Sequence, residues 1–310
     1  MTTPYKEIAS DLGFPEGPIA MPDGSILLVE ISGQTLKRIT PDGKQHVVAR
    51  LGGSPNGAAM GPGGKIYVAN SGGNTWSKRP EGRVLPGLQP AEYKSGSIQI
   101  VDPETGKFET LYDSCDGRPL KGPNDLVFDN AGGFWFTDTG KTRERDMDRG
   151  AVYYAKADGS KIEEKIFPID RPNGCGLSPD GKTLYVTETL TARCWAFDLA
   201  GPGDIISANH PYRGEPGRLI AGLGGYQMFD SLAVDSAGHI CVATLITGAI
   251  SDIAPDGEIV GQYALPDPNV TNICFGGDDL RTAYVTLSST GKLVSFEWPR
   301  PGLKLEYLNK

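Results

Sequence analysis

Six polar residues recur at the start of similar segments along the chain, and their types suggest cation chemistry. Two are carboxylates, Glu16 and Asp230. The other four are the amides Asn56, Asn124, Asn173 and Asn272. Carboxylate and amide oxygens are the ligands that hard divalent cations prefer. Two carboxylates would neutralise a divalent charge, while the amides would add coordination or hydrogen bonds to a substrate. The set predicts a metal site if the fold brings these residues together.

The segments that these residues open have the pattern of β-hairpins. Each continues with alternating apolar residues, a turn that contains glycine, and a second apolar run. Two examples are GPNDLVFDNAGGFWFTD from Gly122 and RPNGCGLSPDGKTLYVTE from Arg171. Alternation with a period of two indicates a half-buried strand, and the turns are typical of hairpins. The chain is therefore expected to be rich in antiparallel strands and poor in helix.

Second hairpins lie between these segments, such as residues 36–39 turning through Pro41-Asp42-Gly43 into residues 46–48. Two hairpins make four strands, and 310 residues divided among six repeats give about 52 residues per unit. This predicts an all-β, single-domain protein over residues 1–310. Its fold would be a six-bladed β-propeller with four-stranded antiparallel blades around a central channel. A terminal strand must close the ring, and both residues 5–9 and residues 303–307 qualify.

Propeller geometry would bring the six anchor residues to one place. The innermost strands of all blades run along the axis in the same direction, so residues at their starts lie at one end of the channel. Asparagine and aspartate before a strand are also common turn formers, and for any single position this structural interpretation stays open. Their recurrence at one register in six repeats favours the metal site.

With these residues the chain resembles the family of gluconolactonase, regucalcin (senescence marker protein) and luciferin-regenerating enzyme. The resemblance covers nearly the whole chain and rests on the motifs Glu16-Gly17-Pro18, Pro123-Asn124-Asp125 and Pro172-Asn173-Gly174, and on Asp230 at the start of its repeat. It implies a propeller that hydrolyses lactones, commonly those of sugars. It also implies that Glu16, Asn173 and Asp230 hold one divalent metal and that Asn124 contacts the substrate.

One position departs from the family pattern. Animal regucalcin-like members carry a sugar-binding arginine two residues before the central asparagine, where this chain has Gly122. Lys121, or an arginine from an insertion over residues 74–93, is a candidate for that role.

The expected chemistry needs a polarised carbonyl, a nucleophilic water and a proton acceptor. A bound cation supplies the first and acidifies a ligated water, while a carboxylate or imidazole accepts the proton. The three histidines, His46, His210 and His239, fall in segments away from the anchors. We therefore assign the catalytic base to Asp230, with Glu16 second.

The remaining anchors and one aromatic residue are expected to bind the substrate. These are Asn56, Asn272 and Tyr226, the last lying shortly before Asp230. Oxygen ligands favour Ca²⁺ as the bound ion, with Mg²⁺, Mn²⁺ and Zn²⁺ as alternatives.

Three classes of function fit this interpretation. A metal-dependent lactonase comes first. A related phosphotriester hydrolase, resembling diisopropylfluorophosphatase, would share the cation but attack phosphorus. A non-catalytic calcium-binding propeller is the third class, although such a scaffold has no need of two carboxylates at the axis.

Composition narrows the setting in which the protein acts. A formal net charge of −8, with lysine and arginine scattered along the chain, provides no basic patch for nucleic acid or an anionic membrane. The five cysteines include no C-x-x-C pair, and the first nine residues lack an apolar signal-peptide core. We therefore expect a cytoplasmic protein whose partner is a small lactone. The sequence gives no indication of the oligomeric state.

Overall fold

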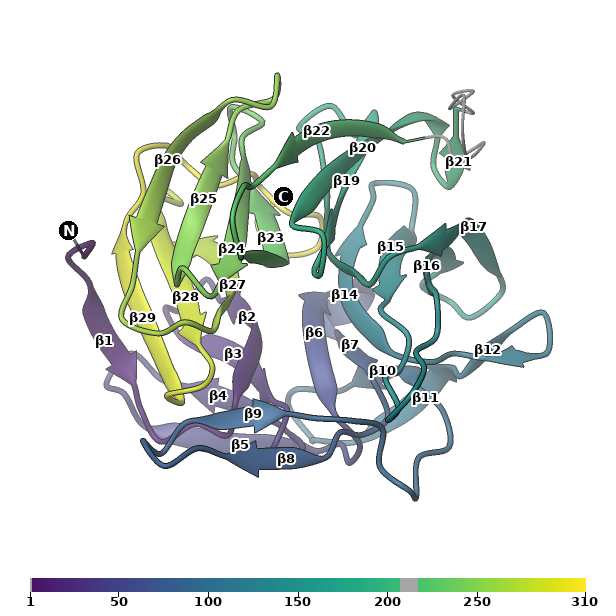
Figure 1. The fold of residues 1–310 in the computed structure, drawn as a ribbon, viewed down its shortest axis with the longest axis horizontal. Helices are drawn as coiled ribbons and strands as arrows, with labels where there is room; N and C mark the ends of the chain where they lie inside the picture. The colour runs from purple at the N-terminus through teal and green to yellow at the C-terminus, as the bar shows by residue number, and fades with distance from the viewer. Residues whose placement is uncertain (1, 207–216) are drawn as a thin grey trace.

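The structure is a computed structural model, and it describes residues 2–206 and 217–310. Its strands form six antiparallel sheets arranged as blades around a central axis (Figure 1). The innermost strand of each blade packs against the innermost strands of both neighbouring blades, so the ring is closed. The structure thus confirms the predicted six-bladed β-propeller.

Blades 1 to 3 each contain four strands. Blade 1 consists of β2 (Pro15–Ala20), β3 (Ile26–Glu30), β4 (Thr35–Ile39) and β5 (Gln45–Arg50). Blade 2 consists of β6 (Pro55–Met60), β7 (Ile66–Asn70), β10 (Ser97–Val101) and β11 (Phe108–Tyr112). Blade 3 consists of β14 (Pro123–Phe128), β15 (Gly133–Asp138), β16 (Gly150–Lys156) and β17 (Ile162–Ile169).

Blades 4 to 6 complete the ring. Blade 4 consists of β18 (Pro172–Leu177), β19 (Thr183–Glu188) and β20 (Arg193–Gly201), with both β21 (Asp204–Ile205) and β22 (Arg218–Gly222) paired to β20. Blade 5 consists of β23 (Met228–Val234), β24 (Ile240–Leu245), β25 (Ala249–Ile253) and β26 (Ile259–Ala264). Blade 6 consists of β27 (Val270–Gly276), β28 (Thr282–Leu287), β29 (Lys292–Glu297) and β1 (Lys6–Ala9).

The N-terminal strand closes the ring. β1 pairs with β29, with Lys6 opposite Ser295, and the two strands lie side by side in Figure 1 although they come from opposite ends of the chain. The C-terminal alternative instead crosses the far end of the channel, where Leu303 N donates to Val234 O at 3.1 Å. Tyr307 packs edge-on against Phe128 there, with ring centroids 5.3 Å apart. The last residues therefore cover the ring and leave its closure to β1.

Apolar seams between the blades hold the ring together. One cluster joins Ile98 of blade 2 to Phe134 of blade 3, and another joins Ile250 of blade 5 to Val285 of blade 6. All four side chains are fully buried. Burial of each such side chain stabilises the fold by about 1.5–3 kcal/mol, so each blade depends on its neighbour for its stability.

Helix is scarce, as the sequence predicts. In the described part of the chain the one helical element is a short 3₁₀ turn, η1 (Pro62–Gly64). Across the same residues, the structure contains no helix with the length and apolar character needed to span a bilayer.

Candidate functional site

The six anchor residues all lie at the start of innermost strands. Glu16, Asn56, Asn124 and Asn173 are the second residues of β2, β6, β14 and β18, and Asp230 and Asn272 are the third residues of β23 and β27. Because these strands form the inner ring and start at the same end of it, the anchors surround one mouth of the channel.

An irregularity in strand pairing recurs at this height in every blade. The register between the first and second strands shifts next to each anchor, for example between Glu16 and Ile19 and between Pro123 and Leu126. A β-bulge re-aims side chains and interrupts the alternation of faces. Consecutive polar side chains can therefore both lie near the channel.

Glu16 is a buried carboxylate that a neighbouring blade holds in place. Its side chain is only 2% exposed. Oε2 accepts hydrogen bonds from Gly17 N at 3.0 Å and from Asn272 Nδ2 at 2.9 Å. Burial raises the pKa of Glu16 to about 7, although the hydrogen bond from Asn272 opposes the shift. Asn272 therefore orients Glu16, while its contact with substrate stays a prediction.

Asp230 and Asn173 form the second part of the site. Ser231 connects them, since its N–H donates to Asp230 Oδ1 at 3.1 Å and its hydroxyl to Asn173 Oδ1 at 3.3 Å. Asn173 Nδ2 donates to Thr189 Oγ1 at 3.1 Å, which fixes the amide. Burial, and then the charge of Glu16, raise the pKa of Asp230 well above its usual range. Two of the predicted ligands thus act on each other electrostatically from opposite parts of the sequence.

Asn124 has an unused acceptor. Its Oδ1 is buried, and none of the described residues donates a hydrogen bond to it. A buried polar atom without a partner costs about 1–3 kcal/mol, so such atoms tend to mark a place where a ligand completes the contact.

Asp125 is a third carboxylate in the cluster and was not assigned from the sequence. It is buried, and its Oδ1 accepts from Leu126 N at 2.9 Å. Burial, together with the charge of Glu16, raises its pKa to about 7. Strict alternation along β14 would have turned Asp125 away from Asn124, but the register shift breaks that alternation. The feature of the sequence that could have identified Asp125 is its position inside the Pro123-Asn124-Asp125 motif.

Buried threonines tie the anchors of successive blades together. Thr187 Oγ1 accepts from Gly174 N of its own blade at 2.9 Å and donates to Asp230 O of the next blade at 2.7 Å. Thr137 makes the same bridge from Asp125 N to Asn173 O. These positioning residues were also missed, although a threonine near the end of the second apolar run recurs in the repeats.

The predicted insertion forms a wall over part of the mouth. It contains the hairpin of β8 (Trp76–Lys78) and β9 (Val84–Pro86). Val84 N donates to Ser289 O of blade 6 at 3.2 Å, and Gln89 N donates to Thr142 O of blade 3 at 2.9 Å. The insertion therefore contacts both blade 6 and blade 3.

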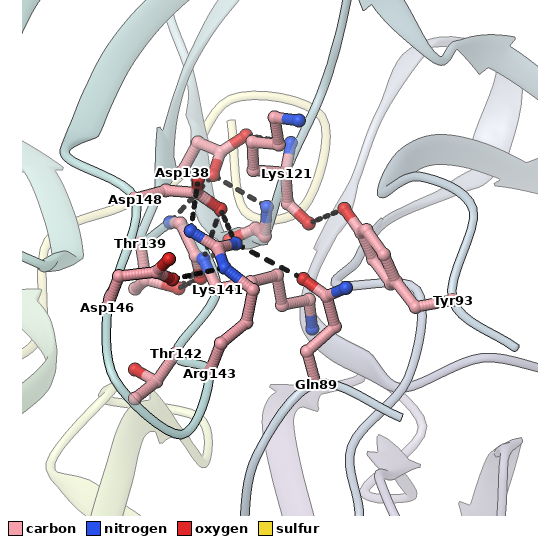
Figure 2. Close-up of polar contacts among 12 residues, drawn as sticks. Gln89, Tyr93, Lys121, Asp138, Thr139, Lys141, Thr142, Arg143, Asp146 and Asp148 are labelled. Carbon is pink, nitrogen blue, oxygen red and sulfur yellow. Dashed lines mark hydrogen bonds and ion pairs between the residues drawn. The ribbon is translucent and has the colours of Figure 1, made fainter. Parts of the chain in front are cut away.

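A polar network fixes the loop of blade 3 against this wall. Figure 2 shows Arg143 between Asp146, Asp148 and Gln89, and Nη1 lies 3.0 Å from Asp148 Oδ2. In the same view the Tyr93 hydroxyl donates to Lys121 O at 2.5 Å. Lys121 thus joins this network through its backbone, since its N–H also donates to Asp138 Oδ2 at 2.7 Å, and its proposed role in substrate binding stays a prediction.

The other predicted residues differ in their surroundings. Asn56 is half-buried on β6, whereas Tyr226 is 74% exposed ahead of β23. Their contact with substrate stays a prediction. His46 lies on the exposed face of β5, and His210 is outside the described residues.

A second acidic group lies beyond the other end of the inner strands. One ligand atom from each of Asp235, His239 and Asp252 lies within 4.8 Å of the others, close enough to hold a cation. Arg300 already contacts both carboxylates, with Nη2 2.5 Å from Asp252 Oδ2 and Nε paired with Asp235. Since the guanidinium supplies the positive charge here, this group anchors the C-terminal segment, and a metal ion would have to displace Arg300.

The mouth cluster brings negative charges together. Burial raises the pKa values of Glu16, Asp125 and Asp230, and repulsion by the charge of Glu16 raises those of Asp125 and Asp230 as well. A divalent cation would relieve that repulsion, and the partnerless Asn124 Oδ1 supplies a neutral oxygen beside it.

Fold and site together define a six-bladed propeller with buried carboxylates and amides around one channel mouth. The chain belongs to the SMP-30/gluconolactonase/LRE-like family, whose family model matches residues 14–289.

Its relatives include sugar and other lactonases. The chain is 27% identical over 312 residues to a gluconolactonase of Zymomonas mobilis, covering 93% of this chain and 80% of that protein. It is 34% identical over 266 residues to the lactonase drp35 of Staphylococcus saprophyticus, covering 85% and 73%. Among solved structures, the calcium-binding protein regucalcin from Agrobacterium tumefaciens superposes with a TM-score of 0.77 at 19% identity, covering 100% and 98%. This likeness shows the shared fold.

Proposed function

We propose that this protein is a metal-dependent lactonase that opens a lactone to its hydroxy acid. The observation that carries the proposal is the cluster of three buried carboxylates beside the partnerless Asn124 Oδ1 at the channel mouth. Family membership and the lactonases among its relatives support this reaction class.

Glu16, Asn173 and Asp230 would hold the ion. When bound, a divalent ion polarises the lactone carbonyl and lowers the pKa of a ligated water. Ca²⁺ is the first candidate because every ligand atom is an oxygen.

The chain's own residues supply position and a proton acceptor. Asp230 accepts the proton of the attacking water, and the Ser231 N–H holds its Oδ1 at 3.1 Å. Asn272 keeps the Glu16 carboxylate in place through the 2.9 Å hydrogen bond. A metal-bound carboxylate is a weak base, so it suits an activated ester such as a lactone better than an amide.

Substrate profiling with and without metal tests the proposal. Purified protein is treated with a chelator and then supplied with Ca²⁺, Mg²⁺, Mn²⁺ or Zn²⁺. Initial rates are measured on lactones of differing ring size and on a fluorophosphate. We expect lactone hydrolysis that the chelator abolishes and that one of these ions restores. Preferential turnover of the fluorophosphate would make the protein a phosphotriesterase, and metal binding without turnover of either would make it a non-catalytic propeller.

A further inference from the structure

Two cationic side chains, Arg171 and Lys141, lie in the wall of the same channel mouth. Arg171 directly precedes β18, two residues before Asn173. Lys141 belongs to the loop that follows β15. Arg171 Nη1 donates to Thr142 Oγ1 at 2.5 Å. Because Thr142 follows Lys141 directly in the chain, this hydrogen bond attaches the Arg171 guanidinium to the loop that carries Lys141.

Lys141 is buried, and its direct contacts are with neutral groups. It is only 4% exposed. Its Nζ donates to Gly73 O at 2.7 Å and to Ser71 Oγ at 3.3 Å, and it lies 5.2 Å from the centre of the Tyr93 ring. An ammonium has three donors, so these contacts leave one for a ligand.

Neither cation has an ion-pair partner in the described part of the chain. Among the described residues, no carboxylate oxygen lies within 4.0 Å of a side-chain nitrogen of Lys141 or Arg171. Buried lysine and arginine side chains are usually paired, because an uncompensated buried charge is costly. Lys141 is buried and Arg171 is half-buried, so these two cations close together point to an anion that the ligand brings.

The carboxylates near them have other partners. Asp138 accepts hydrogen bonds from the N–H groups of Lys121, Gly122 and Gly140. Asp148 is bidentate with Arg143, at 3.0 and 3.1 Å (Figure 2). The Asp230 carboxylate, whose charge acts on Arg171, belongs to the proposed metal cluster.

The backbone conformation at Arg171 recurs in the repeat. Its φ is +48°, and Phe14, at the same place before β2, has a φ of +56°, so this left-handed conformation belongs to the fold. The Arg171 carbonyl accepts from Thr189 N at 3.1 Å. The equivalent position of blade 3 is Gly122, where a Cβ would lie 2.6 Å from Gly140 O. Blade 4 therefore has room for a long cationic side chain just before its innermost strand, whereas blade 3 does not.

We propose that Arg171 and Lys141 form a specificity subsite for an anionic group, so that the preferred lactone carries an ionised carboxylate or phosphate. This deepens the proposed function and rests on it. Arg171 is two residues before Asn173, so the anionic group would bind beside the proposed metal ligands. In a protein with a net charge of −8, this local pair of cations also offsets the repulsion of an anionic substrate.

Steady-state kinetics on charged and neutral lactones test the subsite. The substrates are D-glucono-1,5-lactone (neutral), D-glucaro-1,4-lactone (carboxylate) and 6-phospho-D-glucono-1,5-lactone (phosphate), with saturating metal and correction for spontaneous hydrolysis. We expect at least one anionic lactone to exceed the neutral one in kcat/KM by about tenfold or more. Charge-assisted hydrogen bonds contribute on this scale, and the two anionic substrates show which group is bound.

Variants separate recognition from a structural role. Arg171→Met and Lys141→Met should each lower kcat/KM for the anionic lactone by about 10- to 100-fold, mainly through KM, and change the neutral lactone less than about threefold. Arg171→Lys should recover part of the loss, and Lys44→Met, in the exposed turn between β4 and β5, should change neither. Equal losses on neutral and anionic lactones would overturn the proposal, because they would show that Arg171 only balances the charge of Asp230. Absence of any preference for anionic lactones in the wild type would also overturn it, while leaving the lactonase proposal intact.

A binding measurement keeps the subsite testable if no lactone is hydrolysed. Calorimetric titration with D-glucitol 6-phosphate, D-gluconate and D-glucitol compares phosphate, carboxylate and neutral polyols without any reaction. Binding of an anionic polyol that Arg171→Met and Lys141→Met weaken at least tenfold supports the subsite, and equal affinity for all three polyols refutes it.

Discussion

The buried carboxylate cluster predicts that the metal-free protein loses stability as the pH rises. Burial and the charge of Glu16 raise the pKa of Asp125 from 3.8 to about 7. Between these two values the folded state binds a proton that the unfolded state has lost, so the free energy of unfolding falls as pH increases through this window. The stabilisation is fully present below the unfolded pKa and is gone above the folded one.

The expected size follows from the shift. About three pKa units at roughly 1.4 kcal/mol each correspond to about 4 kcal/mol for Asp125 between pH 4 and pH 8. Glu16 changes in the same direction, from 4.5 to about 7, and since the two groups interact their contributions do not simply add.

Urea unfolding of chelator-treated protein between pH 5 and pH 8 measures this effect. Asp125→Asn, which removes the ionisable group but keeps the side chain's shape, should flatten the pH dependence. Asp116→Asn, in the exposed turn between β12 (Ser114–Cys115) and β13 (Arg118–Pro119), should leave it unchanged. Added Ca²⁺ should raise stability most at high pH, because the ion binds the ionised carboxylates. Parallel pH curves for the wild type and Asp125→Asn would refute the reasoning.

Four further experiments test the site and the ring. Asp230→Ala should lower kcat on a lactone by about 100-fold or more while unfolding stays cooperative, and substantial residual turnover would show that Asp230 is not the base. Glu16→Gln should weaken metal binding in calorimetry, and unchanged affinity would show that Glu16 is not a ligand. Thr187→Val removes the hydroxyl between Gly174 N and Asp230 O, and should cost about 1–3 kcal/mol in urea unfolding together with a drop in kcat. Deleting residues 2–9 should destabilise the protein more than deleting residues 304–310, because only the first deletion removes β1 from blade 6 and opens the ring. Equal losses of stability in thermal unfolding would contradict this.

The repeat pattern made the fold accessible from the sequence. Alternating apolar stretches and glycine turns specify local hairpins, since strand faces and turn conformations depend on residues close in the chain. Six copies of one pattern then predict a propeller, and the anchor residues follow from their common place in each copy. The choice between residues 5–9 and 303–307 for closure could not be made locally, because both segments have the composition of an edge strand.

Tertiary structure decided which side chains meet at the mouth. Asp125 joins the cluster because a register shift interrupts the alternation of β14, and such a shift depends on pairing with β15. Arg171 and Lys141 come from different blades, and only the packing of those blades reveals that neither has a carboxylate partner among the described residues. Local patterns determine strands and turns, whereas charge compensation and burial depend on neighbours far away in the sequence.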